Sequence, residues 1–237
     1  MNSSNNYCGN YEFCNLCPYV HYHYSNYEEV TRSDKTLKPT EFGEQVLKPK
    51  KFSISYPFIK NEDNIESIAK VNNAIIDKVN NLFKTGVLLP EKVEFYEVLG
   101  NYQVMLNEKG LLSILFNLYT YVNKAAHGYT SYGSITANIQ TGQIYSFSDL
   151  FNPKIYYVGF LNEIVQEYIK TNNITLINKY NGITPNQQYY LTPDKLVLYY
   201  QVYEYTPYYY GLFKIEIPYE KMENLITPFS PINKLLH

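Results

Sequence analysis

The spacing of apolar side chains divides much of this chain into alternating segments that are joined in pairs by tight turns. Two segments rich in β-branched and aromatic residues, 93–106 and 111–122, flank Asn107-Glu108-Lys109-Gly110, a composition typical of a hairpin turn. Strands joined so closely pair antiparallel, because a parallel partner needs a crossover of a dozen or more residues. The other predicted strands are 52–56, ended by Pro57, then 134–139, 143–147, 189–191, 196–203 and 210–217, with turns at 140–142 and 192–195.

Two longer segments show the 3.6-residue period of an amphipathic helix. Residues 63–83 carry Ile and Val at three- and four-residue spacings, and Gly86 follows their end. Residues 158–169 repeat this pattern, and a short helix is predicted over 219–226. The predicted fold class is therefore α+β: mainly antiparallel sheet hairpins packed with two long amphipathic helices and a short C-terminal helix. The apolar stripe of the first helix is interpreted as core.

Charge and composition narrow the class of function. The chain has 20 Lys and Arg against 22 Asp and Glu, a formal charge of -2, so no nucleic-acid partner is predicted. The unusual feature of the composition is its 28 Tyr with no Trp. Asn, Ile, Lys and Tyr share A/T-rich codons, which accounts for part of the tyrosine excess. A tyrosine also buries a large ring while its hydroxyl needs a partner or water, which suits a sheet with one wet face.

The sequence shows neither an export signal nor a membrane span. The longest apolar run, 111–116, is far shorter than the ~20 residues that cross a bilayer. Residues 1–8 lack both a basic start and an apolar h-region. We therefore expect a chain made in the cytoplasm without a signal peptide, where thiols are normally reduced.

Residues 1–45 hold Asn, Ser, Tyr, Cys and charged residues without helical or strand periodicity, and we interpret them as a flexible N-terminal arm. Cys14-Asn15-Leu16-Cys17 is a C-x-x-C pair, and two thiolates with a nearby imidazole can chelate Zn²⁺. Structural zinc sites usually draw a second ligand pair from farther along the chain, and none follows here, so no cofactor is predicted and zinc is the alternative. The candidate metal ligands are Cys8, Cys14, Cys17, His21 and His23.

The same arm also has the composition of a cross-linking segment, since its tyrosines interleave with thiols. Thiols can oxidise to disulfides and phenols can couple, and the composition resembles that of bacterial spore-coat proteins, which lack export signals because the mother cell makes them. An unstructured polar arm without such a role is the remaining interpretation. The candidate cross-linking residues are Cys8, Cys14, Cys17, Tyr19, Tyr22 and Tyr24.

Three ordered stretches resemble a known bacterial family. They are SYPFI (55–59) with VNNAI (71–75); YVNKAAHG (121–128), NIQTGQ (138–143) and SDLF (148–151); and LTPDKLVL (191–198), YEYTPYYYG (203–211) and IPY (217–219). Over about residues 50–226 they resemble the tandem DUF4163/DUF3298 unit of Gram-positive bacteria. That unit occurs in the extracytoplasmic, lysozyme-binding region of the anti-sigma factor RsiV and beside peptidoglycan deacetylase domains.

The resemblance implies a binding module rather than a catalyst. It implies a DUF4163-like region at 46–140 and a DUF3298-like region at 141–237, which together form one compact unit over 46–237. The family usually shows two glycines before the Ala-His pair, where this chain has Lys124 and Ala125. Because glycine tolerates positive φ and lysine does so poorly, we expect another conformation for the loop around His127.

No catalytic motif is recognisable. The sequence has no Gly-rich phosphate loop, no G-x-S-x-G elbow and no H-E-x-x-H, so it predicts no enzyme. His127 could act as a base, but a structural histidine bonded to loop backbone is the preferred interpretation. The predicted binding residues are His127 and the run Tyr208, Tyr209 and Tyr210, whose rings would offer a contact surface. That run could equally be a strand with alternate rings in the core.

Two functions from different classes remain. The first is a non-catalytic structural or assembly protein, deposited in a bacterial spore coat or surface layer, with protein partners or self-assembly. The second is a binding module that recognises a cell-wall ligand such as peptidoglycan, or a lysozyme-like protein. The lack of a signal peptide and an anchor favours the first. A peptidoglycan-active hydrolase is a third class, for which no residues are recognisable.

Overall fold

The computed structural model describes residues 39–47, 52–60, 64–88 and 94–236. The candidate metal and cross-linking residues of the arm, from Cys8 to Tyr24, lie outside these ranges. Within them the chain builds two sheets and three α-helices, which confirms the α+β prediction. No helix in the described part is long and apolar enough to cross a membrane.

The larger sheet has six strands that follow one another in chain order. Neighbours pair antiparallel except β2 and β3, which pair parallel because the helix α1 (Ile65–Phe83) carries the chain back before β3 begins. The hairpin turn predicted at 107–110 joins β3 to β4, where Lys109 and Gly110 both have positive φ. The strands are β1 (Phe42–Leu47), β2 (Phe52–Ile59), β3 (Phe95–Glu108), β4 (Leu111–Val122), β5 (Tyr129–Asn138) and β6 (Gln143–Ile144).

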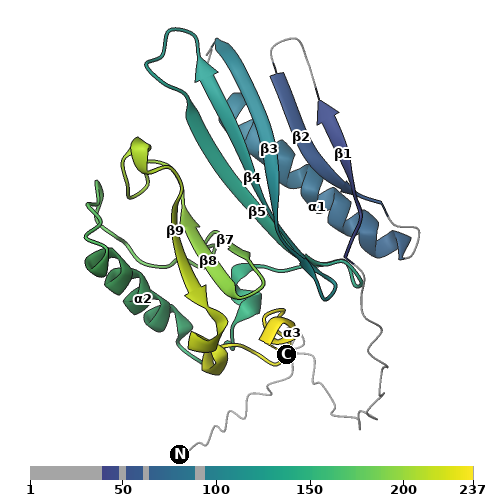
Figure 1. Cartoon of the computed structure of the whole chain (residues 1–237), viewed down its shortest axis with the longest axis vertical. Coiled ribbons are helices and arrows are strands. Elements are labelled where there is room, and N and C mark those ends of the chain that lie inside the picture. The colour runs from purple at the N-terminus through teal and green to yellow at the C-terminus, as the bar shows by residue number, and fades with distance from the viewer. Residues whose placement is uncertain (1–38, 48–51, 61–63, 89–93, 237) are drawn as a thin grey trace, which may run out of the picture. The chain divides into compact units, whose positions relative to one another are not determined.

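Helix α1 lies across one face of this sheet (Figure 1). Most of its predicted apolar stripe is core and packs on alternate residues of β4 such as Ile114 and Phe116. One polar side chain is buried there: Asn72 accepts from the backbone N–H of Ile59 over 2.9 Å and donates to the carbonyl of Ile59 over 3.1 Å. The buried part of the stripe consists of Ile68, Val71, Ile75, Val79 and Leu82. Ile65 and Ile76, which the sequence also assigns to that stripe, are exposed, because they lie at its start and at its margin.

The smaller sheet consists of β7 (Tyr189–Leu191), β8 (Lys195–Tyr200) and β9 (Phe213–Pro218), all antiparallel. Helix α2 (Tyr157–Thr171) runs alongside it (Figure 1), and Leu161 and Val165 of α2 share a core with the inner side chains of β8 and β9. The short helix α3 (Asn233–Leu236) ends the described chain.

The two sheets meet through the face of β4 and β5 that α1 leaves free. Leu115 of β4 packs against Tyr190, Val197 and Tyr199 of the smaller sheet. Polar atoms at this contact are paired: the backbone N–H of Leu191 donates to Ser113 Oγ over 3.0 Å. Because α1 covers one face of β4 and the smaller sheet covers the other, the burial of β4 is nearly continuous and its two faces cannot be told apart by polarity.

Several predicted boundaries differ from the structure. The strand predicted at 134–139 begins earlier, as β5 at Tyr129, and the one predicted at 143–147 ends at Ile144. The strand predicted at 196–203 ends at Tyr200, because the chain turns at 201–204.

The strand predicted to end before Pro57 continues to Ile59. Beyond Ile54 its described partner is β1 alone, so the proline, which has no N–H to donate, can face the side on which no described strand pairs. Tyr208–Tyr210 is a 3₁₀ turn, so β9 begins at Phe213 instead of residue 210. The predicted helix over 219–226 is two 3₁₀ turns, since Met222 leaves helical geometry with φ -119° and is fully buried.

Strand β1 begins at Phe42, within the range 1–45 that the sequence assigns to the arm. The segment FGEQVL lacks the strict alternation by which the other strands were predicted. The segment is instead held as a strand by its antiparallel pairing with β2, from Phe42 opposite Ile59 to Leu47 opposite Ile54.

Candidate functional site

Three aromatic rings from two separate loops meet at one end of the larger sheet. The ring of His127, in the loop between β4 and β5, stacks on Tyr208 with centroids 4.3 Å apart and an interplanar angle of 23°. Tyr203 completes the group, with its ring centroid 5.8 Å from that of Tyr208 and its hydroxyl 3.1 Å from His127 Nε2. We call His127, Tyr203 and Tyr208 the aromatic cluster.

The hydrogen bonds of His127 assign its tautomer. Nδ1 lies 2.8 Å from the carbonyl oxygen of Gly128, which can only accept, so Nδ1 carries the proton. In the neutral ring Nε2 is then an acceptor, and it receives the hydroxyl proton of Tyr203. The bond to loop backbone predicted for this histidine is therefore present. A ring held at both nitrogens is fixed in orientation.

The loop that carries His127 is closed by a tight turn. The N–H of Ala125 donates to the carbonyl of Val122 over 3.0 Å, and Lys124 has φ 66°. A lysine thus adopts here the positive φ that a glycine would adopt without strain. The hydroxyl of Tyr121 donates to the carbonyl of Ala125 over 3.0 Å and fastens the loop to β4.

Gly128 is required for a different reason. A Cβ at this position would overlap the ring of Tyr119 from β4, so the backbone of Gly128 and that ring are in close contact. Loss of solvent, followed by the neighbouring Tyr208, raises the pKa of Tyr119. The same two causes, in the same order, raise the pKa of Tyr132 on β5. These hydroxyls therefore stay protonated at neutral pH and surround the cluster with neutral donors.

The second loop, 201–211, repeats the same turn chemistry. The N–H of Glu204 donates to the carbonyl of Gln201 over 3.0 Å, and Tyr203 in this turn has φ 67°. The Glu204 carboxylate accepts from the N–H of Gln201 over 2.8 Å and secures the turn. Each loop of the cluster thus holds one non-glycine residue in the left-handed region, a conformation found in few such residues.

The structure separates the four predicted binding residues. His127 and Tyr208 come together in the aromatic cluster. Tyr209 is 83% exposed and projects from the 3₁₀ turn. Tyr210 packs edge-on against Phe213, 5.7 Å between centroids, and is 41% exposed. Tyr203 was missed, because the sequence places it at the end of a strand and nothing local shows that it reaches His127.

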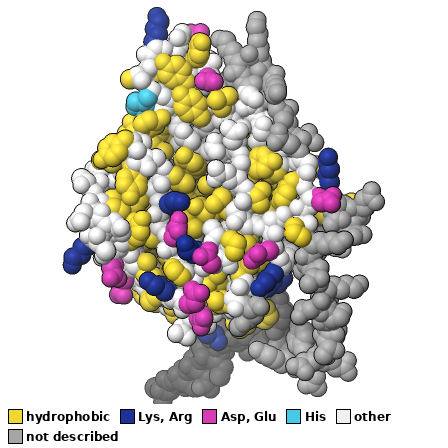
Figure 2. Space-filling model, in the orientation of Figure 1, with side chains coloured by type: hydrophobic (Ala, Val, Ile, Leu, Met, Phe, Trp, Pro, Cys, Tyr) yellow, Lys and Arg dark blue, Asp and Glu magenta, His cyan; other side chains and the backbone are white. Residues whose placement is uncertain are grey.

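The cluster lies on an aromatic surface of the protein. Figure 2 shows hydrophobic side chains gathered beside a histidine toward one end of the visible face. Tyr129, at the start of β5, adds a ring that is 42% exposed, and Tyr203 is 41% exposed. Tyrosines combine large rigid rings with a polar tip, which suits a contact surface. Among the described residues, no three or more His, Cys, Asp or Glu side chains gather closely enough to hold a metal ion.

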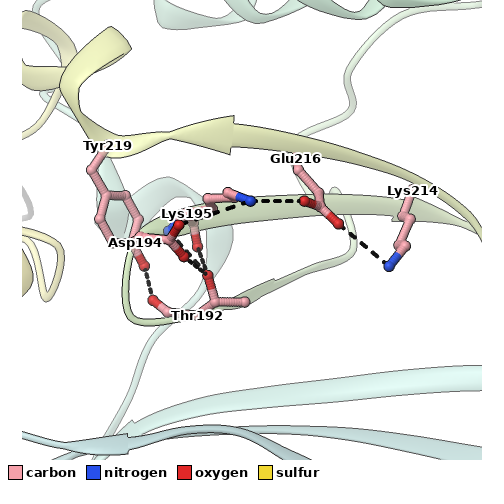
Figure 3. Close-up of polar contacts among 6 residues, drawn as sticks. All are labelled: Thr192, Asp194, Lys195, Lys214, Glu216 and Tyr219. Atoms are coloured by element: carbon pink, nitrogen blue, oxygen red, sulfur yellow. Dashed lines mark hydrogen bonds and ion pairs between the residues drawn. The ribbon is translucent and has the colours of Figure 1, made fainter.

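A separate polar group joins the last blocks of the family resemblance (Figure 3). The hydroxyl of Tyr219 donates to the carbonyl of Thr192 over 2.6 Å, and the N–H of Lys195 donates to Thr192 Oγ1 over 3.0 Å. Glu216 lies between Lys195 at 3.1 Å and Lys214 at 3.4 Å. The bond from Lys195 lowers the pKa of the Glu216 carboxyl. The charges are mutually compensated and the turn is internally bonded, so this group is structural.

Comparisons with known proteins agree with the fold. Residues 148–220 match the profile of the family described as "Protein of unknown function (DUF3298)". This segment holds α2, the smaller sheet and the loop with Tyr203 and Tyr208, but neither α1 nor His127. The search of the curated proteins found no match to this chain.

Two solved structures have a similar fold. One is a DUF3298 family member from Bacteroides fragilis NCTC 9343, 16% identical, with a TM-score of 0.61; the match covers 85% of this chain and 99% of that chain. The other is a DUF3298 family protein from Pseudomonas aeruginosa PAO1, 15% identical, with a TM-score of 0.58; the match covers 83% of this chain and 96% of that chain. At these identities the likeness concerns the fold alone.

Proposed function

We propose that this chain is a non-catalytic binding module and that the aromatic cluster is the centre of its contact surface. The observation that carries the proposal is the stacking of His127 on Tyr208, 4.3 Å apart, at an end of the sheet where Tyr203 and Tyr209 remain exposed. Interfaces concentrate their binding energy in a few such rings, and tyrosine is among the residues enriched there.

The two loops support this role because their conformation is fixed before any ligand binds. Left-handed Lys124 and Tyr203 cost conformational energy, and such strain is found preferentially at binding and active sites. Hydrogen bonds at both nitrogens of His127 hold its ring in place. A preorganised surface loses less entropy on binding, which raises affinity.

The resemblance to the tandem DUF4163/DUF3298 unit suggests the ligand. In RsiV that unit binds lysozyme, and elsewhere it accompanies domains that act on peptidoglycan. We therefore propose a lysozyme-like protein or a cell-wall ligand as the partner of the aromatic cluster. Exposed phenol rings can stack on either a protein side chain or a sugar ring, so the two partners must be tested side by side.

The test measures binding of the full chain to hen egg-white lysozyme and to purified peptidoglycan in parallel, by calorimetry and by co-sedimentation. We expect one of the two to bind, and Tyr208→Ala to weaken that binding about tenfold or more, as loss of a central aromatic ring does. Tyr156→Ala is the matched control, since Tyr156 is 80% exposed, directly precedes α2 and lies outside the cluster. If neither partner binds at about 100 µM, a concentration above the Kd of most specific complexes, the result would count against the proposal.

A structural role in a spore coat remains the second proposal. It depends on Cys8, Cys14, Cys17 and the tyrosines among them, all outside the described residues. It predicts that the protein is made during sporulation and leaves spores only when a reductant is added. Recovery of the protein from vegetative cells in a freely extractable form would contradict it.

A further inference from the structure

Strand β5 has an open edge. On one side it pairs with β4 along its whole length, from Tyr129 opposite Thr120 to Asn138 opposite Leu111. On the other side the two-residue strand β6 covers only Ala137 and Asn138. Within the described chain no strand therefore pairs with the outer side of β5 between Tyr129 and Ile135. An unpaired edge is a template on which another extended segment can add.

The outward backbone groups of β5 follow from the alternation of an antiparallel pair. Tyr132 directs both its N–H and its carbonyl outward, because both bond to the side chain of Gln201, over 2.9 and 3.0 Å. Thr136, four residues on, also directs its carbonyl outward, to the N–H of Tyr145 at 2.8 Å. Alternate residues share a direction, so the N–H and carbonyl groups of Thr130 and Ser134 face the same open side.

Gln201 occupies this edge with the chemistry of a peptide. Its carboxamide offers one acceptor and one donor in the arrangement of a backbone amide, and it satisfies both groups of Tyr132. The site thus already accepts a peptide-like group at its centre. Positions two residues to either side, Thr130 and Ser134, have no such partner among the described residues. An extended chain that replaces the Gln201 carboxamide at Tyr132 would also pair with these two positions.

A hollow runs along this edge in two parts that share Gln188. The larger, about 470 Å³, is lined by the end of α1 at Asn81 and Thr85, by Tyr129 and Tyr132 of β5, and by Gln201. The smaller, about 180 Å³, is lined by Lys78 of α1, Ser134 of β5 and the segment 186–189. The hollow is therefore elongated parallel to β5, with amides, hydroxyls and rings along its walls.

Lys78 is the charged residue of this lining. It is half-buried, and no ion pair to it exists among the described residues. Burial lowers the pKa of its ammonium, as happens when a cation loses water without gaining a partner. A carboxylate in the smaller hollow would supply the missing partner.

We propose that the open edge of β5 is a docking site for an extended peptide segment that pairs with Thr130, Tyr132 and Ser134 and places an acidic side chain against Lys78. The segment displaces the Gln201 carboxamide and adds a strand to the larger sheet, a recognised mode of peptide binding. The inference does not rest on the proposed function of the aromatic cluster.

The experiment uses amide hydrogen exchange of the full chain with a capped strand-forming peptide, Ac-Thr-Val-Thr-Val-Glu-Val-Thr-NH₂. We expect the peptide to slow exchange at Thr130, Tyr132 and Ser134 and to leave the amides of Ser131, Gly133 and Ile135 unchanged, since those face β4. The same peptide N-methylated at alternate residues cannot pair and should give no protection. Glu→Gln in the peptide, or Lys78→Gln in the protein, should each weaken binding about threefold to tenfold, with no further loss when they are combined.

Other results overturn the proposal. Equal protection by the N-methylated peptide would show that the contact is not strand pairing. No protection by the peptide at millimolar concentration would leave Gln201 as a purely structural cap of the edge. Chitotetraose is included as a sugar probe, and protection by it without protection by the peptide would assign the hollow to a glycan. Tyr208→Ala should keep the peptide protection, so the outcome is independent of the aromatic cluster.

Discussion

The ring of His127 stacks on that of Tyr208, 4.3 Å between centroids, although His127 lies between β4 and β5 of the larger sheet and Tyr208 lies between β8 and β9 of the smaller sheet. Neither residue lies in a helix or strand that sequence periodicity defines. The contact joins the loop after β4 to the loop after β8 and gives one end of the protein a fixed aromatic surface.

This contact predicts an energetic coupling between the two rings. In a cycle of His127→Ala, Tyr208→Ala and the double variant, we expect a coupling of about 0.5–1.5 kcal/mol in the free energy of unfolding, the range of aromatic pairs. Urea denaturation measures it. His127→Ala combined with Tyr156→Ala, whose rings have no contact, is the control and should be additive; additivity in the first cycle would refute the stack.

Lys124 predicts a stabilising substitution. Its φ of 66° strains any residue with a Cβ, so Lys124→Gly should raise the free energy of unfolding by about 0.5–1 kcal/mol, despite the greater freedom of glycine in the unfolded chain. Asn123, the preceding residue, does not have positive φ, and Asn123→Gly should be neutral or destabilising. Thermal denaturation compares the two, and equal effects would exclude a strained Lys124.

Asn72 predicts a large loss. Its amide satisfies both backbone groups of Ile59 in the core, so Asn72→Ala should cost about 2–4 kcal/mol by leaving two buried groups unpaired. Asn73, the next residue of α1, is exposed, and Asn73→Ala should change stability by less than about 0.5 kcal/mol. A similar, small loss for both variants would show that the Asn72 bonds contribute little.

Of the residues in Figure 3, Tyr219 and Lys195 should differ in how much stability their substitution costs and in how that loss depends on salt. Tyr219→Phe removes the buried 2.6 Å bond to the Thr192 carbonyl and should cost about 1–2 kcal/mol at any salt concentration. Lys195→Met removes a half-exposed ion pair with Glu216 and should cost less than about 1 kcal/mol, with a smaller loss at high salt. Salt dependence of the Tyr219→Phe loss would contradict this assignment.

The buried tyrosines predict unfolding in alkali. Burial raises the pKa of Tyr180 to about 12 and raises those of Tyr189, Tyr199 and Tyr219 further. The folded state therefore holds these protons more tightly than the unfolded chain, in which tyrosine titrates near pH ~10. The stability they contribute is complete below pH ~10 and is lost as the pH rises above it.

Absorbance of tyrosinate, recorded together with circular dichroism, tests this. Each tyrosine that keeps its proton in the folded state but loses it in the unfolded chain lowers the free energy of unfolding by about 1.4 kcal/mol per pH unit above pH ~10. Tyr180→Phe keeps the ring and removes one such proton, so its stability should fall less steeply between pH 10 and about 12. Ionisation of these tyrosines before the circular dichroism changes would refute the prediction.

Predictions from the sequence succeed where one local pattern is enough. The stripe of α1 from Ile68 to Leu82 is buried as its period requires, and the turn at 107–110 closes the hairpin of β3 and β4. They fail where the conformation of a segment depends on its neighbours in the folded structure. The strand continues past Pro57 because of its position in the sheet, and Tyr208–Tyr210 turns instead of extending.

The sequence by itself determined the class of this fold, because hydrophobic period and turn composition act over a few residues. It also placed His127 and Tyr208 among the candidates. Only the tertiary structure decided that these two rings stack, that Tyr203 joins them 76 residues from His127, and that Gln201 closes part of the β5 edge. Such contacts form between loops whose relative position depends on how two sheets pack, and no local pattern encodes that distance.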